Sequence, residues 1–150
     1  MSSEIEDGHW FKSPLFEVEL GEDKNTNPFC YGKQLSSWVR DQFIDLGYSV
    51  EEVIEEDWGF CVMCQREPYS LWIGCGNMRS DFYETVNEEE HKNFIPEKNS
   101  LIWYCFPTVE VPFFKRIFGK TDTTHGFNKL KSELKTILSN EKEITFVEQP

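Results

Sequence analysis

The hydrophobic positions of this chain recur with two spacings, and the longer spacing predicts helices. Lys33–Leu46 carries apolar side chains three and four positions apart, so that they share one stripe of a helix. Gly47 follows as a residue suited to the left-handed conformation that often ends a helix. Thr123 or Thr124 can cap a second main helix, and Pro112–Phe118 is predicted to form a short one. The two main stripes consist of Leu35, Trp38, Val39, Phe43, Leu46 and of Phe127, Leu130, Leu134, Ile137, Leu138.

Shorter apolar runs bounded by turn residues predict strands. Arg66–Pro68 separates two of these runs and predicts a hairpin between them. Gly74 and Gly76 share one face of the second hairpin strand, where they leave a shallow trough. Two main helices packed on an antiparallel or mixed sheet of about five or six strands make an α+β fold. The predicted strands are Leu15–Leu20, Trp58–Gln65, Tyr69–Asn77, Leu101–Phe106 and Ile144–Val147.

The organisation of the chain predicts a single domain over residues 1–150. Neither an internal repeat nor a linker divides the sequence, and 150 residues suit one core. Residues 1–12 are polar at their start and predict a flexible arm. Residues 79–100 contain Glu88–Glu90 and Pro96 and predict a long polar loop.

The net charge restricts the classes of molecule that the chain is expected to bind. The chain has 27 acidic and 15 basic residues, a formal net charge of −12, while aromatic residues make up 15% and supply a packed core. Nucleic acids and anionic membranes repel such a surface, because affinity for them comes from lysine and arginine. We therefore expect no direct nucleic-acid or membrane partner, and instead a basic protein that the acidic surface attracts.

The cysteines and the start of the sequence predict a reducing compartment. Met1–Asp7 is acidic and lacks the basic and apolar regions of a signal peptide, so a cytoplasmic location is expected. Five cysteines are present, and Cys61, Cys64, Cys75 and Cys105 lie in apolar strand-like runs. We interpret them as free, buried, small hydrophobic residues.

The motifs of redox and metal chemistry have structural explanations here. Cys61 and Cys64 are three positions apart on a predicted strand, so their thiols point to opposite faces. A redox pair needs its first cysteine at the start of a helix. A structural zinc site needs four converging ligands, commonly from two close pairs, and the sequence has no second close pair. We therefore predict neither a cofactor nor a metal.

Motifs of enzymatic catalysis are also missing from the sequence. It contains no Gly-x-Ser-x-Gly elbow and no Gly-x-x-x-x-Gly-Lys-Ser/Thr phosphate loop. His125 lies where a helix is predicted to begin, a position at which the helix dipole would lower its pKa. The enzymatic alternative is a small hydrolase that uses carboxylates and His125 in a cleft near Gly74 and Gly76.

The segment 51–58 is the most suggestive for function. Five acidic residues in seven positions repel one another unless a cation relieves them, and a tryptophan follows. An acidic cluster beside an aromatic anchor is typical of a charge-complementary protein interface. A solvated acidic loop is the structural alternative. The candidate partner-binding residues are Glu51, Glu52, Glu55, Glu56, Asp57 and Trp58.

The chain resembles a group of small bacterial proteins of uncharacterised activity. The resemblance rests on three segments that occur in the same order: Ile54–Met63, Tyr69–Asn77 and Val111–Lys120. The resemblance extends from Gln34 to the end of the chain and implies a bacterial origin. In size, charge and expected compartment the chain is also similar, by type alone, to bacterial immunity proteins, which are small acidic α+β domains that block a toxin.

Together these observations predict a non-enzymatic, acidic binding protein without catalytic residues. The leading hypothesis is an immunity protein that occludes a basic, nuclease-like bacterial toxin domain, with its carboxylates in place of phosphates. A bacterial adaptor or regulatory subunit is a further alternative beside the hydrolase, and the identity of the partner would separate it from an immunity protein.

Overall fold

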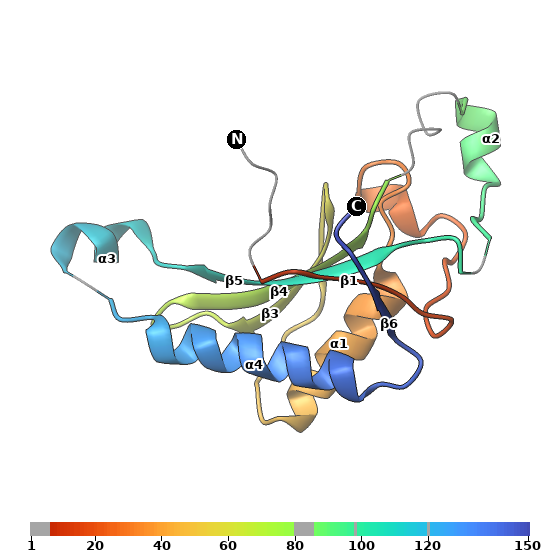
Figure 1. Cartoon of the computed structure of the whole chain (residues 1–150). Helices are drawn as coiled ribbons and strands as arrows, with labels where there is room; N and C mark the ends of the chain where they lie inside the picture. Colours follow the sequence, from red (N-terminus) through yellow and green to blue (C-terminus); the bar gives the residue numbers. More distant parts are fainter. Residues whose placement is uncertain (1–6, 80–85, 98, 120) are drawn as a thin grey trace.

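The computed structural model of the chain has one six-stranded antiparallel sheet with helices packed against it (Figure 1). It describes residues 7–79, 86–97, 99–119 and 121–150. The strand order is β2-β3-β4-β5-β1-β6, and every neighbouring pair is antiparallel, which confirms the predicted α+β class. The strands are β1 (His9–Lys12), β2 (Ile54–Glu56), β3 (Gly59–Gln65), β4 (Ser70–Asn77), β5 (Trp103–Glu110) and β6 (Thr145–Val147).

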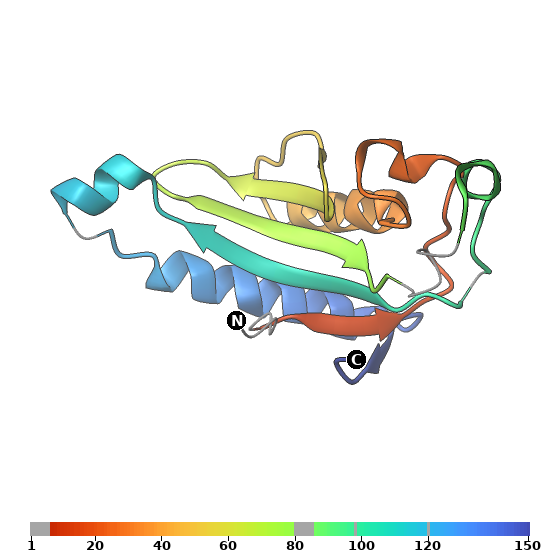
Figure 2. The same cartoon turned by 90° about the horizontal axis from the view of Figure 1, so that it is seen from above.

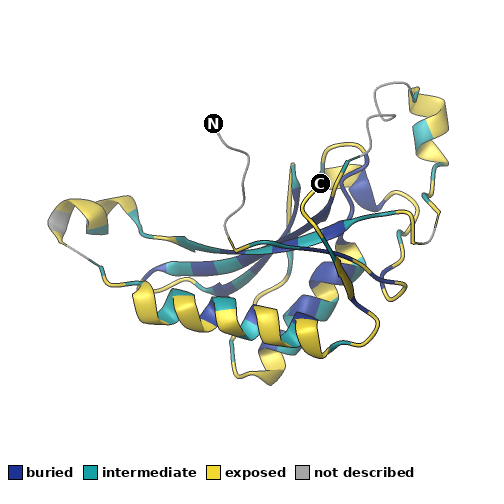
Figure 3. Cartoon of the chain, viewed as in Figure 1, coloured by how far each residue is buried: buried dark blue, intermediate teal, exposed yellow. Residues whose placement is uncertain are grey.

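The two long helices, α1 (Lys33–Asp45) and α4 (Thr124–Asn140), cover the same face of the sheet (Figures 1 and 2). Their stripes bury Leu35, Val39 and Phe43 from α1 and Leu130, Leu134 and Leu138 from α4. These side chains form one core with the inward-facing residues of the strands. Figure 3 shows the buried positions along the inner sides of the helices and the central strands. The helical spacing in the sequence thus predicted both helices correctly.

The end of α1 follows the local signals of the sequence. Gly47 adopts φ 100°, a left-handed value that favours glycine, and directs the chain back toward the sheet. The ring of Tyr48 then packs 5.3 Å from that of Phe43, and its hydroxyl donates a hydrogen bond to Glu133 Oε1 of α4 at 2.6 Å. This turn therefore ties the two main helices to each other.

The first strand of the sheet differs from the prediction. His9–Lys12 forms β1, which pairs with β5 on one side and β6 on the other, so it is wrong to extend a flexible arm to residue 12. Trp10 and Phe11 are buried in it. Leu15–Leu20, predicted as a strand, is a loop whose backbone N–H groups at Glu17 and Glu19 bond to side chains instead of a neighbouring strand.

The predicted polar loop 79–100 contains a short helix, α2 (Glu88–Lys92), while positions 80–85 and 98 lie outside the described residues. Asn87 caps this helix by accepting a hydrogen bond from Glu90 N. His91 Nε2 lies 2.6 Å from Asp23 Oδ2 of the single-turn 3-10 helix η1 (Glu22–Asn25). The predicted short helix is present as α3 (Phe113–Phe118) after Pro112. No helix in the described ranges is long and apolar enough to cross a membrane.

Candidate binding surface on the helix-free face of the sheet

The alternation of side chains along the strands divides the sheet into a core face and a second face without a helix. On β4, Leu71 and Ile73 point into the core beneath α1 and α4. The residues between and beyond them, including Trp72, Gly74 and Gly76, therefore lie on the other face. Figure 2 looks onto this face, and no described helix covers it.

Two aromatic rings fill the trough that the glycines of β4 leave. Phe106 of β5 lies directly opposite Gly74 in the ladder, and Tyr104 lies opposite Gly76. A Cβ atom added to Gly74 would overlap the ring of Phe106, and one added to Gly76 would lie 3.0 Å from Tyr104 Oη. The glycines thus allow both rings to lie across the neighbouring strand. The groups that approach these glycines closely are therefore side chains of the same chain, Phe106 and Tyr104.

Four aromatic residues form a continuous group that we call the aromatic surface: Trp58, Trp72, Tyr104 and Phe106. The ring of Trp58 lies 5.7 Å from that of Trp72 and 5.5 Å from that of Phe106, and the rings of Tyr104 and Phe106 stack 5.8 Å apart. These separations are within the favourable range for aromatic pairs. All four residues remain partly exposed, so the surface is available for contact.

Carboxylates border the aromatic surface. Glu110, at the end of β5, accepts a hydrogen bond from Trp72 Nε1 at 3.3 Å. Glu56 lies on the same face because its partner in the ladder is Gly59, two positions from the outward-facing Cys61. Burial, followed by the nearby charge of Glu56, raises the pKa of Cys61 to about 12, so its thiol is neutral. The border of this surface therefore carries negative charge at Glu56 and Glu110, while its centre is apolar.

The predicted acidic cluster divides between the molecule's own cations and the solvent. Glu51 forms a bidentate ion pair with Arg66, in which Arg66 Nη2 lies 2.6 Å from Glu51 Oε2. These hydrogen bonds hold the pKa of Glu51 below its usual value. Glu52 lies 3.7 Å from Arg40 Nη2 of α1. Both carboxylates are thus already paired, which leaves less of their charge for a partner.

The remaining candidates lie along and beyond the edge strand β2. Glu55 faces the helix side, where it lines a cavity with Lys33 and Arg40 of α1. Glu56 and Trp58 face the helix-free side, and exposed Asp57 lies in the turn between them. The structure therefore brings Glu56 and Trp58 together on one surface and directs Glu55 away from it.

The sequence did not identify Trp72, Tyr104, Phe106 and Glu110 as members of this surface. The alternation within Leu101–Phe106 already places Tyr104 and Phe106 on one face of their strand. Their position over the glycines depends on the register between β4 and β5, which no local signal specifies.

His125 and the two glycines of β4 do not form a common site. His125 is exposed in the first turn of α4, on the helix side of the sheet. Gly74 and Gly76 lie on the opposite face under Phe106 and Tyr104. The cleft that the hydrolase alternative requires is therefore not formed by these residues.

The cysteines are packing residues in this structure. Cys64 faces the core and Cys61 faces the opposite side, as the strand periodicity predicted. Cys75 and Cys105 are fully buried and face each other across β4 and β5, with their sulfur atoms 3.8 Å apart. Burial raises the pKa of Cys75 well above its usual value, which suppresses formation of a thiolate.

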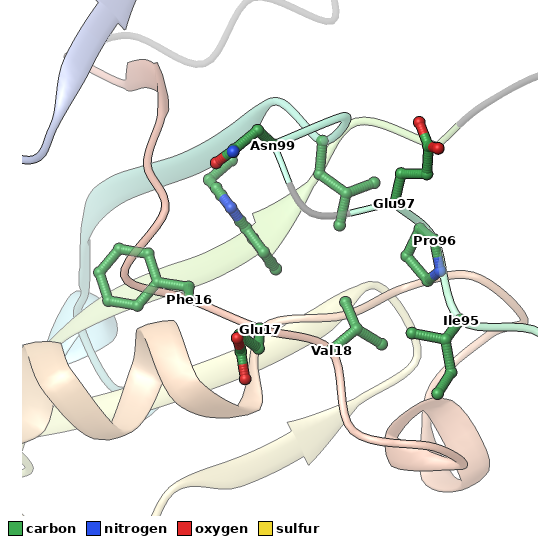
Figure 4. A pocket seen from close by; sticks show the side chains of 9 residues that line it. Phe16, Glu17, Val18, Ile95, Pro96, Glu97 and Asn99 are labelled. Carbon is green, nitrogen blue, oxygen red and sulfur yellow. The ribbon is translucent and has the colours of Figure 1, made fainter.

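A separate cavity of about 240 Å³ lies beside the aromatic core of the helix side (Figure 4). Phe16, Val18 and Trp103 give it apolar walls, and Figure 4 shows the side chain of Glu97 directed away from it. Among the described residues that line it, Glu17 and Glu97 are the titratable ones.

Comparison with known proteins gives no independent assignment of this surface. The resemblance to a group of small bacterial proteins accordingly stays a prediction, as does the likeness by type to immunity proteins. The chain matches no protein-family model, no curated protein and no solved structure.

Proposed function

We propose that this chain is a non-enzymatic binding protein, and specifically an immunity protein that occludes a basic, nuclease-like toxin domain. The aromatic surface with its carboxylate border is the observation that supports the proposal most strongly. It joins four partly exposed aromatic rings to negative charge on a face that no described helix covers. Interfaces with basic proteins need both properties.

The chemistry of such a partner is complementary to this face. A protein that acts on nucleic acid carries lysine and arginine where the phosphates bind. Guanidinium and ammonium groups bind to indole faces and to carboxylates. Trp58 and Trp72 supply the indoles, and Glu56 and Glu110 supply the carboxylates. Occupation of the toxin's phosphate-binding surface is then sufficient for inhibition, without any reaction.

The roles within the acidic cluster follow from its contacts. Glu56, Asp57 and Trp58 would contact the partner directly. Glu51 and Glu52, already paired with Arg66 and Arg40, would instead contribute to the long-range field that accelerates association. The net charge of −12 has the sign that steers a basic domain toward the chain.

The test is affinity capture from a lysate of the encoding organism, followed by kinetics with the captured partner. A basic toxin domain should be recovered in stoichiometric amount, and it should associate faster at low salt. A variant with Glu56→Lys and Glu110→Lys should associate at least tenfold more slowly and dissociate faster, because two attractive contacts become repulsive. Inhibition of the toxin's activity by the purified chain completes the test.

The matched control changes the net charge equally on another part of the molecule. Glu141→Lys with Glu143→Lys alters the loop between α4 and β6, away from the aromatic surface. Equal slowing by both double variants would remove the aromatic surface from the proposal. A stoichiometric partner without toxin activity would favour an adaptor, and the absence of any stoichiometric partner would contradict a dedicated binding role.

A further inference from the structure

The short helix α3 presents large apolar side chains to the solvent. Phe113, Phe114 and Ile117 are 69%, 57% and 58% exposed. Ile117 follows the two phenylalanines by four and three positions, so all three side chains meet on one surface of the helix. Figures 1 and 2 show α3 beyond the end of the sheet, apart from α1 and α4. Single exposed apolar residues are ordinary, but a contiguous group commonly marks an interaction site.

The charge of α3 is opposite to that of the whole molecule. Residues 111–119 include two cations and no acidic residue, whereas the chain has a net charge of −12. Lys115 lies 3.2 Å from Glu67 and also donates to Pro68 O, so it ties α3 to the turn between β3 and β4. Arg116 is exposed, and its guanidinium forms no ion pair with a carboxylate of the described residues. The helix therefore joins apolar side chains to an available cation.

The aromatic surface has the complementary composition. Its four rings are partly exposed, and the carboxylates on its border, Glu56 and Glu110, are exposed as well. Neither carboxylate forms an ion pair with a lysine or arginine in the part of the chain that the structure describes. Only two residues separate Glu110 from the start of α3, so the helix and this surface adjoin at one end of the molecule.

Each copy of the chain thus has both halves of a complementary contact. An interface needs apolar groups at its centre and opposite charges on the two sides, and α3 and the aromatic surface together supply them. A lipid surface could cover α3, but it would leave the aromatic surface exposed, and the net charge of −12 opposes an anionic membrane. A second copy covers both surfaces at once. At an ionic strength of about 0.15 M, repulsion between the two acidic molecules is screened beyond about 8 Å.

We propose that this chain pairs with a second copy of itself, with α3 of each copy on the aromatic surface of the other. Phe113 and Ile117 contact the aromatic rings, and Arg116 is directed toward the carboxylates of the border. A two-fold axis makes this exchange reciprocal and closes the assembly as a dimer. The inference does not depend on the proposed occlusion of a toxin, because no other protein takes part. Where both hold, the toxin and the second copy compete for one surface.

The experiment is sedimentation velocity of the full chain over a series of concentrations at about 0.15 M ionic strength. The mass should rise reversibly from the monomer value of 17.7 kDa to twice that value. The α3 variant, Phe113→Ser with Ile117→Ser, should raise the Kd of the dimer at least tenfold, because buried apolar anchors contribute most of the free energy of an interface. Leu20→Ser with Ile95→Ser removes side chains that are 57% and 53% exposed elsewhere and should leave the Kd unchanged.

Mixing two defective variants tests which surfaces meet. The surface variant, Glu56→Lys with Glu110→Lys, should by itself also weaken the dimer at least tenfold. A mixture of the surface variant, labelled with a fluorophore, and the α3 variant should associate more strongly than either variant alone. The reason is that the intact α3 of the first variant fits the intact aromatic surface of the second.

A chain that stays monomeric up to about 1 mM would overturn the proposal. So would equal effects of the α3 variant and its control, or a mixture that associates no better than its components. Binding of a monomeric chain to vesicles of phosphatidylcholine and phosphatidylserine, lost in the α3 variant, would assign α3 to a lipid surface instead. The α3 variant retains the aromatic surface and should still capture the proposed toxin, so the two proposals can fail separately.

Discussion

At the scale of single residues, Gly74 determines how the helix-free face is built. Phe106 occupies the space above it, and any larger residue would displace that ring. The ring in turn contacts Trp58, Trp72 and Tyr104. The absence of a Cβ atom at Gly74 therefore determines where Phe106 lies, and through it the arrangement of the aromatic surface.

Gly74→Ala should lower the free energy of unfolding by about 1–3 kcal/mol, because overpacking forces a ring and its neighbours to move. Urea unfolding followed by circular dichroism measures the change. Gly119→Ala is the control, since a Cβ there meets nothing within 4 Å, and it should alter stability by less than about 0.5 kcal/mol. Comparable effects of the two substitutions would contradict the packing described for Gly74.

The ion pair between Glu51 and Arg66 makes a prediction about pH. A carboxyl whose pKa is lowered on folding stabilises the folded state at every pH above the pKa that it has in the unfolded chain, near 4.5. This contribution is lost as the pH falls through the lower pKa of the folded state. Arg66→Gln should therefore raise the pKa of Glu51 toward 4.5, as measured by titration of its carboxyl ¹³C signal. Lys92→Gln, which removes a cation from α2, should leave that signal unchanged.

At the scale of elements, the long periodic helices and the last strand, β6, could be predicted from the sequence, whereas the short strands β1 and β2 could not. The stripes of α1 and α4 repeat over several turns, so each has many positions that agree. β1 has four residues, too few for a pattern to emerge, and its stability comes from pairing with two distant strands. Leu15–Leu20 has the apolar residues of a strand, but Phe16 and Val18 pack on the core from a loop.

Hydrogen exchange distinguishes these two segments. The amides of Trp10 and Phe11 should exchange at least tenfold more slowly than those of Leu15–Leu20, because β1 is an inner strand. Mass spectrometry of exchanged peptides, or amide NMR, gives the rates directly. Equal rates in the two segments would mean that β1 is not stably paired.

The candidate site was partly predictable for the same reasons. Local alternation placed Gly74 and Gly76 on one face, and charge density indicated the region around Glu56 and Trp58. The contact between Trp72 and Glu110 connects residues 38 positions apart and depends on the register between β4 and β5. Register depends on the whole sheet, so this contact required the structure.

At the scale of the whole molecule, β2 forms one edge of the sheet and exposes backbone groups that a neighbouring chain could pair with. Glu55 and Glu56 place a carboxylate on each face of this three-residue strand. Charged side chains on a short edge strand oppose such pairing between molecules. This protection should weaken as the pH approaches the isoelectric point of about 4.7.

Glu55→Gln combined with Glu56→Gln should therefore raise the pH at which the protein begins to associate. Static light scattering during acidification from pH 7 measures the onset. Glu141→Gln with Glu143→Gln removes the same charge elsewhere and should shift the onset less. If both double variants shift the pH of onset equally, net charge alone governs association and the edge strand β2 makes no specific contribution.

The rings that lie across Gly74 and Gly76 have a consequence for the thermodynamics of recognition. Phe106 and Tyr104 are held by the strand beneath them and by each other, so they have already lost most of their rotational freedom in the unbound protein. A partner that docks on them causes little further loss of side-chain entropy. If a partner docks here, we therefore expect it to bind without rearrangement of this face.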